Sequence, residues 1–347
     1  MKSAGHSCEY RRTRRDLTRW VAAAHLALML STASVWAADA AQEKATGDKL
    51  AFAAAGKEFQ FDTGALRGTL RSQGRSLGLT PVLDAESGGK VSGAFGLFSH
   101  YRLLDAEARY GHAAWDWASQ AKLLPDGSVE ASWTADKEHP FDLKAVYRWK
   151  APNTFDVATS VTVGAPLRGR PESGGHIGPP LQRFEVFLAS YFDGFEAPFV
   201  YVKGCPETGG KPGFVEAKKP SGDWQAFPRD DDAVKIIQDG RWKRPPNPVD
   251  WKIMPALAAP LAIRRDAKSG SVAVLMAPAG DCFAISTPYT GEGHRSVYLS
   301  LFGRDLKAGE TATARSRLVI GRGISDEQAI ALYEAYLKES QGAEKGK

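Results

Sequence analysis

A short run near the C-terminal end of the chain carries side chains suited to acid–base chemistry on a polyhydroxy ligand. From His294 to Phe302 the sequence alternates as a β-strand does, which places His294, Ser296, Tyr298 and Ser300 on one face. An unperturbed histidine changes its charge near neutral pH, so His294 is the best candidate for a general acid or base. The alternative is an outer strand whose polar face meets solvent.

Glu185 is the best candidate for a partner carboxylate, because it stands alone in the otherwise apolar run 184–192. A buried glutamate needs a partner, and Arg183 or Arg295 could provide one. The alternative role for Glu185 is therefore a structural ion pair.

Two further clusters contain residue types that bind sugars, namely flat aromatic rings and planar polar groups. His112 and Trp115 lie in the first, residues 111–117, and Arg229 and Trp242 lie in the second, within the long segment 202–255. Core packing of the first cluster and a structural cover formed by the second are the alternatives. The predicted ligand-binding set is His112, Trp115, Arg229, Trp242, Arg295 and Tyr298.

The sequence predicts neither a metal site nor a bound cofactor. The run Asp230–Asp232 lacks the ligand spacing of a calcium loop and is better explained as a solvated acidic turn. The histidines are scattered, and the chain has no phosphate-binding glycine loop, serine-nucleophile elbow or paired-cysteine zinc motif.

Residues 1–37 are predicted to be a signal peptide, with a basic start around Arg11–Arg19 and an apolar run over Trp20–Leu30 that is too short to span a bilayer. Thr13–Leu17 resembles the twin-arginine export pattern, and an ordinary secretion signal is the alternative. We therefore expect a periplasmic or secreted protein, with residues 38–49 as a flexible linker.

Removal of residues 1–37 takes away six basic and two acidic residues, which lowers the formal net charge from +5 to +1. No basic stripe with interleaved aromatic residues is left, so the sequence argues against a nucleic-acid partner. No later apolar run is long enough for a membrane span. The remaining cysteines, Cys205 and Cys282, could form one disulfide in an oxidising compartment, although a free buried Cys282 is the stronger expectation.

Almost every element that can be predicted from the sequence is a strand. Residues 141–149 and 154–163 alternate on either side of a turn, which predicts a hairpin with one face in the core. Ser325 and Gln328 form a capping box that starts a helix over residues 325–338. We predict an all-β antiparallel sandwich with long loop insertions and a C-terminal helix, as one domain over residues 50–338, followed by a disordered tail, 339–347.

The order of these strands resembles the galactose mutarotase-like β-supersandwich superfamily, which includes the aldose 1-epimerases. The resemblance covers roughly residues 50–335 and depends on the strand pair at 145–159, the strand 184–188, the segment 294–300 and the turn at Gly309–Glu310. It implies a sugar on the concave face of the larger sheet. The epimerase motif of Asn before a catalytic His is absent, with Ser99-His100-Tyr101 as the nearest counterpart, and the late catalytic Glu has no clear counterpart.

The expected function is that of an exported carbohydrate-binding or carbohydrate-active protein that uses acid–base chemistry, with His294 and Glu185 as the catalytic pair. Isomerase, lyase and hydrolase activities remain open. The alternative is a non-catalytic glycan-binding or envelope scaffold protein on the same fold.

Overall fold

A nine-stranded antiparallel sheet is the largest element of the computed structural model, which describes residues 50–73, 78–111, 114–164 and 180–345. These residues belong to one compact unit. In pairing order, the strands are β12 (Gly213–Glu216), β11 (Ala197–Val202), β15 (Leu257–Arg265), β16 (Ser271–Met276), β19 (Thr311–Arg322), β9 (Thr154–Val163), β8 (Phe141–Ala151), β7 (Val129–Trp133) and β6 (Ser119–Leu123).

A six-stranded sheet packs against the nine-stranded one. Its strands, again in pairing order, are β14 (Trp251–Ile253), β13 (Trp224–Pro228), β17 (Cys282–Pro288), β18 (Ser296–Leu306), β10 (Leu181–Tyr191) and β5 (Ser99–Leu104). All these pairs are antiparallel except β13 with β14. A smaller sheet contains β1 (Ala53–Ala55), β2 (Glu58–Asp62), β3 (Leu66–Arg71) and β4 (Gly78–Asp84).

The main core lies between the two large sheets. The predicted hairpin is β8 with β9, and every second residue of β8 from Phe141 to Trp149 is buried. The opposite wall of this core comes from alternate residues of β10, namely Phe184, Val186 and Leu188. Because side chains on a strand alternate between its faces, Glu185, Phe187 and Tyr191 of β10 point away from this core. The outer face of the six-stranded sheet therefore bears large side chains of its own.

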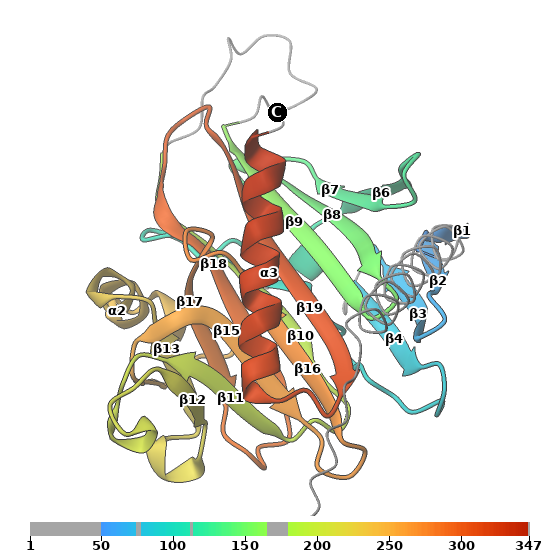
Figure 1. Ribbon diagram of the computed structural model, residues 1–347. Helices are drawn as coiled ribbons and strands as arrows, with labels where there is room; N and C mark the ends of the chain where they lie inside the picture. The colour runs from blue at the N-terminus through green and yellow to red at the C-terminus, as the bar shows by residue number, and fades with distance from the viewer. Residues whose placement is uncertain (1–49, 74–77, 112–113, 165–179, 346–347) are drawn as a thin grey trace, which may run out of the picture. The chain divides into compact units, whose positions relative to one another are not determined.

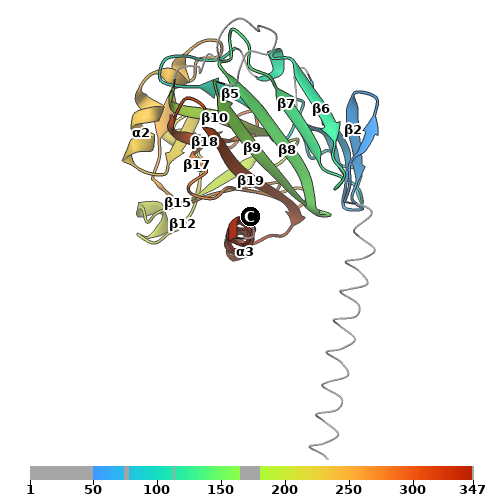
Figure 2. The same cartoon turned by 90° about the horizontal axis from the view of Figure 1, so that it is seen from above.

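The helix α3 (Asp326–Lys345) covers the outer face of the nine-stranded sheet, across β15, β16 and β19 (Figures 1 and 2). It begins at the predicted capping box: Gln328 N–H donates to Ser325 Oγ at 3.2 Å, and Ser325 N–H donates to Gln328 Oε1 at 2.8 Å. The helix continues to Lys345, beyond the predicted end, and Arg317 Nη2 lies 2.9 Å from Glu339 Oε2 in its last part.

The segment 202–255, expected to be irregular, contains several regular elements. Besides β12, β13 and β14 it forms η2 (Pro206–Thr208), η3 (Lys219–Ser221), α2 (Asp231–Gln238) and η4 (Arg241–Lys243). The predicted acidic turn is the start of α2, because the Asp230 side chain accepts from Ala233 N–H at 2.9 Å and caps the helix. The apolar face of α2 and Trp242 of η4 pack on the outer face of the six-stranded sheet.

The predicted all-β antiparallel architecture with a C-terminal helix is confirmed. The predicted hairpin strands appear as β8 and β9. The run 184–192 forms most of β10, and the strand expected from His294 to Phe302 is β18, which begins at Ser296. The sequence did not indicate β5, β6 or β11–β14. One of the expected loop insertions, residues 164–180, falls outside the described residues apart from its ends, as do the predicted signal peptide and linker, residues 1–49.

Candidate functional site

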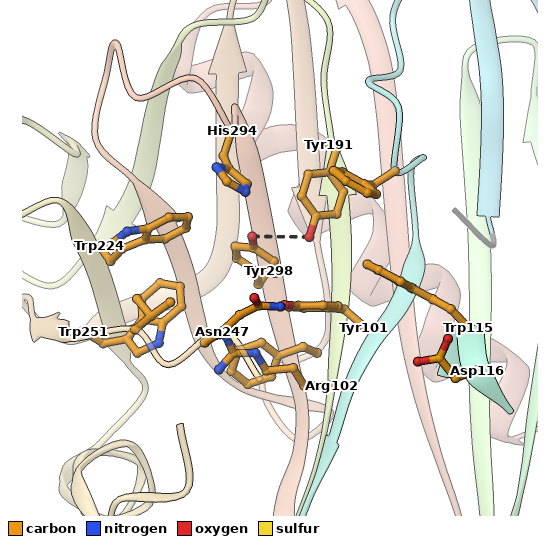
Figure 3. Close-up of a pocket in the computed structure, with 13 residues that line it drawn as sticks. Tyr101, Arg102, Trp115, Asp116, Tyr191, Trp224, Asn247, Trp251, His294 and Tyr298 are labelled. Carbon is orange, nitrogen blue, oxygen red and sulfur yellow. Dashed lines mark hydrogen bonds between the residues drawn. The ribbon is translucent and has the colours of Figure 1, made fainter. Parts of the chain in front are cut away.

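A pocket of about 410 Å³ opens on the outer face of the six-stranded sheet (Figure 3). Its floor comes from β5, β10 and β18, and its walls come from η1 (Ala114–Asp116), the segment 202–255 and the turn before β18. We call it the aromatic pocket. The described residues that line it are Phe95, Tyr101, Arg102, Trp115, Asp116, Phe187, Tyr191, Trp224, Asn247, Val249, Trp251, His294 and Tyr298.

A β-bulge in β5 supplies two neighbouring residues to the pocket floor. The register between β5 and β10 slips at this point, so that Tyr101 and Arg102 both stand opposite Phe187. A bulge inserts one extra residue and re-aims side chains, which explains how successive residues reach the same face. The preceding residue, His100, points into the core instead, where its Nε2 lies 2.9 Å from Thr159 Oγ1. Complete burial lowers the pKa of His100 to about 3.

Two tyrosines from adjacent strands form the centre of the floor. Tyr191 of β10 and Tyr298 of β18 approach with their hydroxyl oxygens 3.5 Å apart, and Ser296 Oγ donates to the Tyr298 hydroxyl at 3.0 Å. Burial raises the pKa of both phenols above the ordinary range, so both remain protonated at neutral pH. Each hydroxyl can therefore donate as well as accept a hydrogen bond.

Aromatic rings stand on two opposed sides of the pocket (Figure 3). On one side, Trp115 stacks between Phe95 and Tyr101, with ring centroids 5.7 and 5.2 Å apart. On the other side, Trp224 and Trp251 meet edge to face at 5.3 Å. The arrangement presents flat apolar surfaces toward a common space, with polar groups between them.

Arg102 is the buried cation of the pocket, with 2% of its surface exposed. Its Nη1 donates to Trp242 O at 2.8 Å and its Nη2 to Asn247 O at 2.7 Å, which anchors the segment 202–255 over the sheet. The guanidinium also lies over the rings of Tyr101 and Phe187, at 5.3 and 5.5 Å. Its buried Nε has no hydrogen-bond partner among the described residues.

His294 lies at the rim of the pocket, where about half of its side chain is exposed. It precedes β18, which begins at Ser296, so the predicted strand starts later than expected. Glu292 holds it from the turn: Oε2 accepts from the His294 backbone N–H at 2.8 Å, and Oε1 lies 3.3 Å from Nδ1. The ring also meets Trp224 edge to face at 5.3 Å.

Glu185, the predicted partner of His294, does not line the aromatic pocket. It is fully buried beneath Trp242, whose Nε1 donates to both carboxylate oxygens at 2.9 and 3.0 Å. Burial raises the pKa of Glu185 to about 8, against the opposing effects of Arg241 and the Trp242 hydrogen bond. Since Trp242 packs on Phe187 and Trp251 of the pocket, it separates Glu185 from any ligand there.

The structure brings only some of the other predicted binding residues to the pocket. Trp115 and Tyr298 line the aromatic pocket with His294, whereas Trp242 lies beneath it. Arg229 does not line it, because its Nε is 2.7 Å from Asp230 Oδ2 and its Nη1 donates to Ala279 O. Arg295 lies beside His294, with Nη2 3.2 Å from Glu196 Oε1. His112 falls outside the described residues.

The disulfide that Cys205 and Cys282 could have formed is absent, and the stronger expectation of a free Cys282 agrees with the structure. Cys205 at the start of η2 and Cys282 at the start of β17 are both buried free thiols. The Cys282 thiol lies 3.2 Å from Ala284 O, and burial raises its pKa to about 12. It is therefore an unreactive core residue, as its buried apolar strand had suggested.

Sequence reasoning missed most of the pocket. Tyr101 and Asp116 lay within a motif and a cluster that it identified, and Trp224, Asn247 and Trp251 lay within the segment 202–255 without being selected as binding residues, whereas Arg102 gave no signal. The resemblance placed a sugar on the larger sheet, whereas the aromatic pocket lies on the six-stranded one. Tyr191 belongs to the predicted strand 184–192, which is rich in aromatic residues, and this was the one usable indication for it.

Among the described residues, no group of three or more His, Cys, Asp or Glu is placed to hold a metal ion. Asp116 is the only carboxylate among the described lining residues, so these residues do not supply the two flanking carboxyl groups of most glycoside hydrolases. No helix in the part of the chain that the structure describes has the length and apolar character needed to cross a bilayer.

No protein-family model and no curated protein matches the sequence. Solved structures align at low identity. A putative aldose 1-epimerase from Escherichia coli K12 aligns over 79% of this chain and 99% of its own, at 11% identity and a TM-score of 0.40. A galactose mutarotase-like protein from Lactobacillus casei aligns over 76% and 100%, at 10% identity and 0.44. An α-N-acetylgalactosaminidase from Bifidobacterium bifidum aligns over 83% and 38%, at 11% identity and 0.45.

Proposed function

We propose that this protein binds a carbohydrate in the aromatic pocket. The observation that supports this proposal best is the pair of opposed aromatic walls, with Trp115 on one side and Trp224 and Trp251 on the other. Sugar rings have apolar C–H faces that pack on aromatic rings, and they have hydroxyl edges that need hydrogen bonds. The pocket volume of about 410 Å³ lies within the range of roughly 300–1,000 Å³ typical of small-molecule sites.

The polar groups between these walls match the hydroxyl edge of such a ligand. The two tyrosine hydroxyls can donate or accept, and Asp116 adds a carboxylate at the margin.

Calorimetry and tryptophan fluorescence with sugars selected on a glycan array test this proposal. We expect saturable binding that Trp224→Ala weakens at least about tenfold, because it removes one of the two rings of an aromatic wall. Tyr201→Ala is the matched control, since Tyr201 is a partly buried aromatic residue on the outer face of the nine-stranded sheet. No saturable binding, or equal losses in both variants, would rule the proposal out.

A second candidate function is acid–base catalysis on the bound sugar, with His294 as the acid or base. It is favoured by the position of the His294 ring at the pocket rim, with Glu292 Oε1 3.3 Å from Nδ1. In this role Glu292 fixes the ring orientation and leaves Nε2 for the substrate. Isomerase, lyase and hydrolase activities all remain within this class.

Product analysis by NMR, on sugars that bind, tests this second function. We expect His294→Gln to lower turnover by about 10²–10⁴ while binding changes little. Glu292→Gln should lower turnover less, because its amide oxygen can still hold the ring. Binding without any product in the unmodified protein would leave the non-catalytic alternative.

We also propose export to the periplasm or beyond, on the basis of the basic and apolar pattern in residues 1–37. Cell fractionation of the full chain tests this. Changing Arg14 and Arg15 to Lys should block export only if the twin-arginine route is used.

A further inference from the structure

The aromatic pocket borders a second cavity of about 320 Å³. The two cavities share three lining residues, Phe95, Tyr191 and His294. The second cavity, which we call the adjoining cavity, adds Ala94, Asp193 and Arg295 from the loops at the same end of β10 and β18. The three shared side chains therefore lie at the boundary between the two cavities.

Backbone hydrogen bonds fix the loops that form the adjoining cavity. Gly93 N–H donates to Tyr191 O at 2.8 Å, and Phe192 N–H donates to Arg295 O at 3.1 Å. A Cβ at Gly93 would lie 3.2 Å from Phe192 O, so this loop approaches the end of β10 more closely than most residues allow. These hydrogen bonds tie the loops around the adjoining cavity to the end of β10, a strand that also forms part of the pocket floor.

The adjoining cavity has the composition of a more open sugar subsite. Asp193 and Ala94 are exposed. The Arg295 side chain is about a third exposed, and its Nη2 lies 3.2 Å from Glu196. Phe95, at the boundary with the aromatic pocket, is also exposed and stacks nearly parallel to Trp115. An apolar ring therefore lies at the boundary between the cavities, and charged groups lie beyond it.

We infer that the ligand contains at least two linked sugar units, one in each cavity. This inference depends on the proposed carbohydrate function and specifies its ligand as an oligosaccharide. One unit lies between the aromatic walls, and the next extends over Asp193 and Arg295. The linkage then passes over Phe95, Tyr191 and His294, which places His294 beside the bond that joins the two units.

The dependence of affinity on chain length tests this inference. The probes are glucose, N-acetylglucosamine and galacturonate, each with its linked dimer and trimer, titrated by calorimetry. We expect the dimer of the preferred series to bind at least about tenfold more tightly than its monomer, because it gains the contacts of the adjoining cavity.

Ala94→Trp should remove this gain while leaving the affinity for the monomer within about twofold. Ala94 lines the adjoining cavity but not the aromatic pocket, and it is exposed, so a large side chain fills that cavity alone. Ala94→Ser is the matched control and should keep the gain. Asp193→Ala provides an independent variant if Ala94→Trp fails to fold, and it should reduce the gain in part.

The outcomes separate this inference from the proposed function. Equal affinities for monomer and dimer in the unmodified protein would overturn the two-unit ligand while leaving sugar binding intact. The same holds if Ala94→Trp weakens monomer and dimer equally, because the cavities would then not be separate subsites. Failure of every probe to bind at millimolar concentration would overturn both proposals.

Discussion

The outer faces of the two large sheets are both covered, but by different means. On the nine-stranded sheet the helix α3 packs Ala329, Tyr333 and Tyr336 against side chains of β15, β16 and β19. On the six-stranded sheet the cover consists of short elements of the segment 202–255, chiefly α2 and η4. Short elements leave space between them, and the aromatic pocket occupies such a space. Cavities of about 410 and 480 Å³ also lie beside the regular cover, α3, but among the described residues that line them only Tyr336 is aromatic. The regular and the irregular cover therefore differ in the aromatic character of the spaces beside them.

The two faces also shift the pKa of a glutamate in opposite directions. Glu185 on the six-stranded sheet is fully buried, and burial raises its pKa to about 8. Glu339 of α3 is partly exposed, and its hydrogen bond from Arg317 lowers its pKa. A neutral buried acid and an ion-paired surface acid give opposite dependences of stability on pH.

The largest expected effect is that of Trp242→Ala, which would remove the centre of the irregular cover. Loss of a buried tryptophan costs about 3–5 kcal/mol, measured as the free energy of unfolding in urea. The change also leaves the Glu185 carboxyl without its donor and should abolish sugar binding. Trp242→Phe keeps much of the volume and should cost less. An unfolding free energy within about 1 kcal/mol of the unmodified protein would contradict the packing role of Trp242.

Tyr333→Ala makes the corresponding change under the regular cover. We expect a loss of about 3 kcal/mol of stability with no change in sugar affinity, because Tyr333 packs on the outer face of the nine-stranded sheet and does not line the aromatic pocket. Urea unfolding and calorimetry measure the two quantities. A clear loss of affinity at full folding would show that the two faces are coupled, which the comparison does not predict.

Glu185→Gln should change how stability depends on pH. The folded pKa of Glu185, about 8, exceeds the unfolded value of about 4.3, so between these values only the folded state holds the proton. Stability therefore falls as pH rises through this window, by up to about 1.4 kcal/mol per pH unit. Glu185→Gln removes that slope, as urea midpoints between pH 5 and 9 would record. An unchanged slope would argue against a neutral Glu185.

Glu339→Gln is the control of opposite sign. The lowered pKa of Glu339 stabilises the fold above the unfolded pKa, and this contribution is lost as pH falls through the folded pKa. The stability of the variant should therefore fall less in acid than that of the unmodified protein. Between pH 6 and 9 its stability should depend on pH in the same way as that of the unmodified protein.

A smaller effect than that of Trp242→Ala is expected from Trp115→Ala, which alters one wall of the pocket. Trp115 is partly buried, so we expect a stability loss below that of Tyr333→Ala and a loss of sugar affinity of about tenfold, or 1.4 kcal/mol. Calorimetry gives the affinity, and Trp115→Phe should retain part of it. Normal affinity in Trp115→Ala would restrict the binding surface to the opposite wall.

Local patterns predicted much of the fold. The strands β8 and β9 alternate with period two on either side of a turn, and this pattern specifies both the hairpin and its buried face. The capping box at Ser325 and Gln328 likewise marks the start of α3 within one residue. These features depend on neighbours in sequence, so the sequence contains them directly.

The strand β5 shows where such reasoning stops. All six residues of Ser99–Leu104 are buried, with His100 and Arg102 among them, so no alternation of apolar and polar residues marks the strand. Its bulge arises from pairing with β10, some 80 residues later, and this pairing alone turns Tyr101 and Arg102 to the same side. The floor of the pocket could therefore not be derived from β5 itself.

The sequence by itself determined the all-β class, the main hairpin, the C-terminal helix and the position of His294 and Tyr298 in one segment, which the structure places at the aromatic pocket. The tertiary structure alone decided that Trp242 seals Glu185 away, and that Arg102, Asn247 and Trp251 meet beside Tyr298. The physical reason is one of range. Periodicity and capping are properties of adjacent residues, whereas a pocket is formed by contacts between segments whose separation in sequence leaves no local trace.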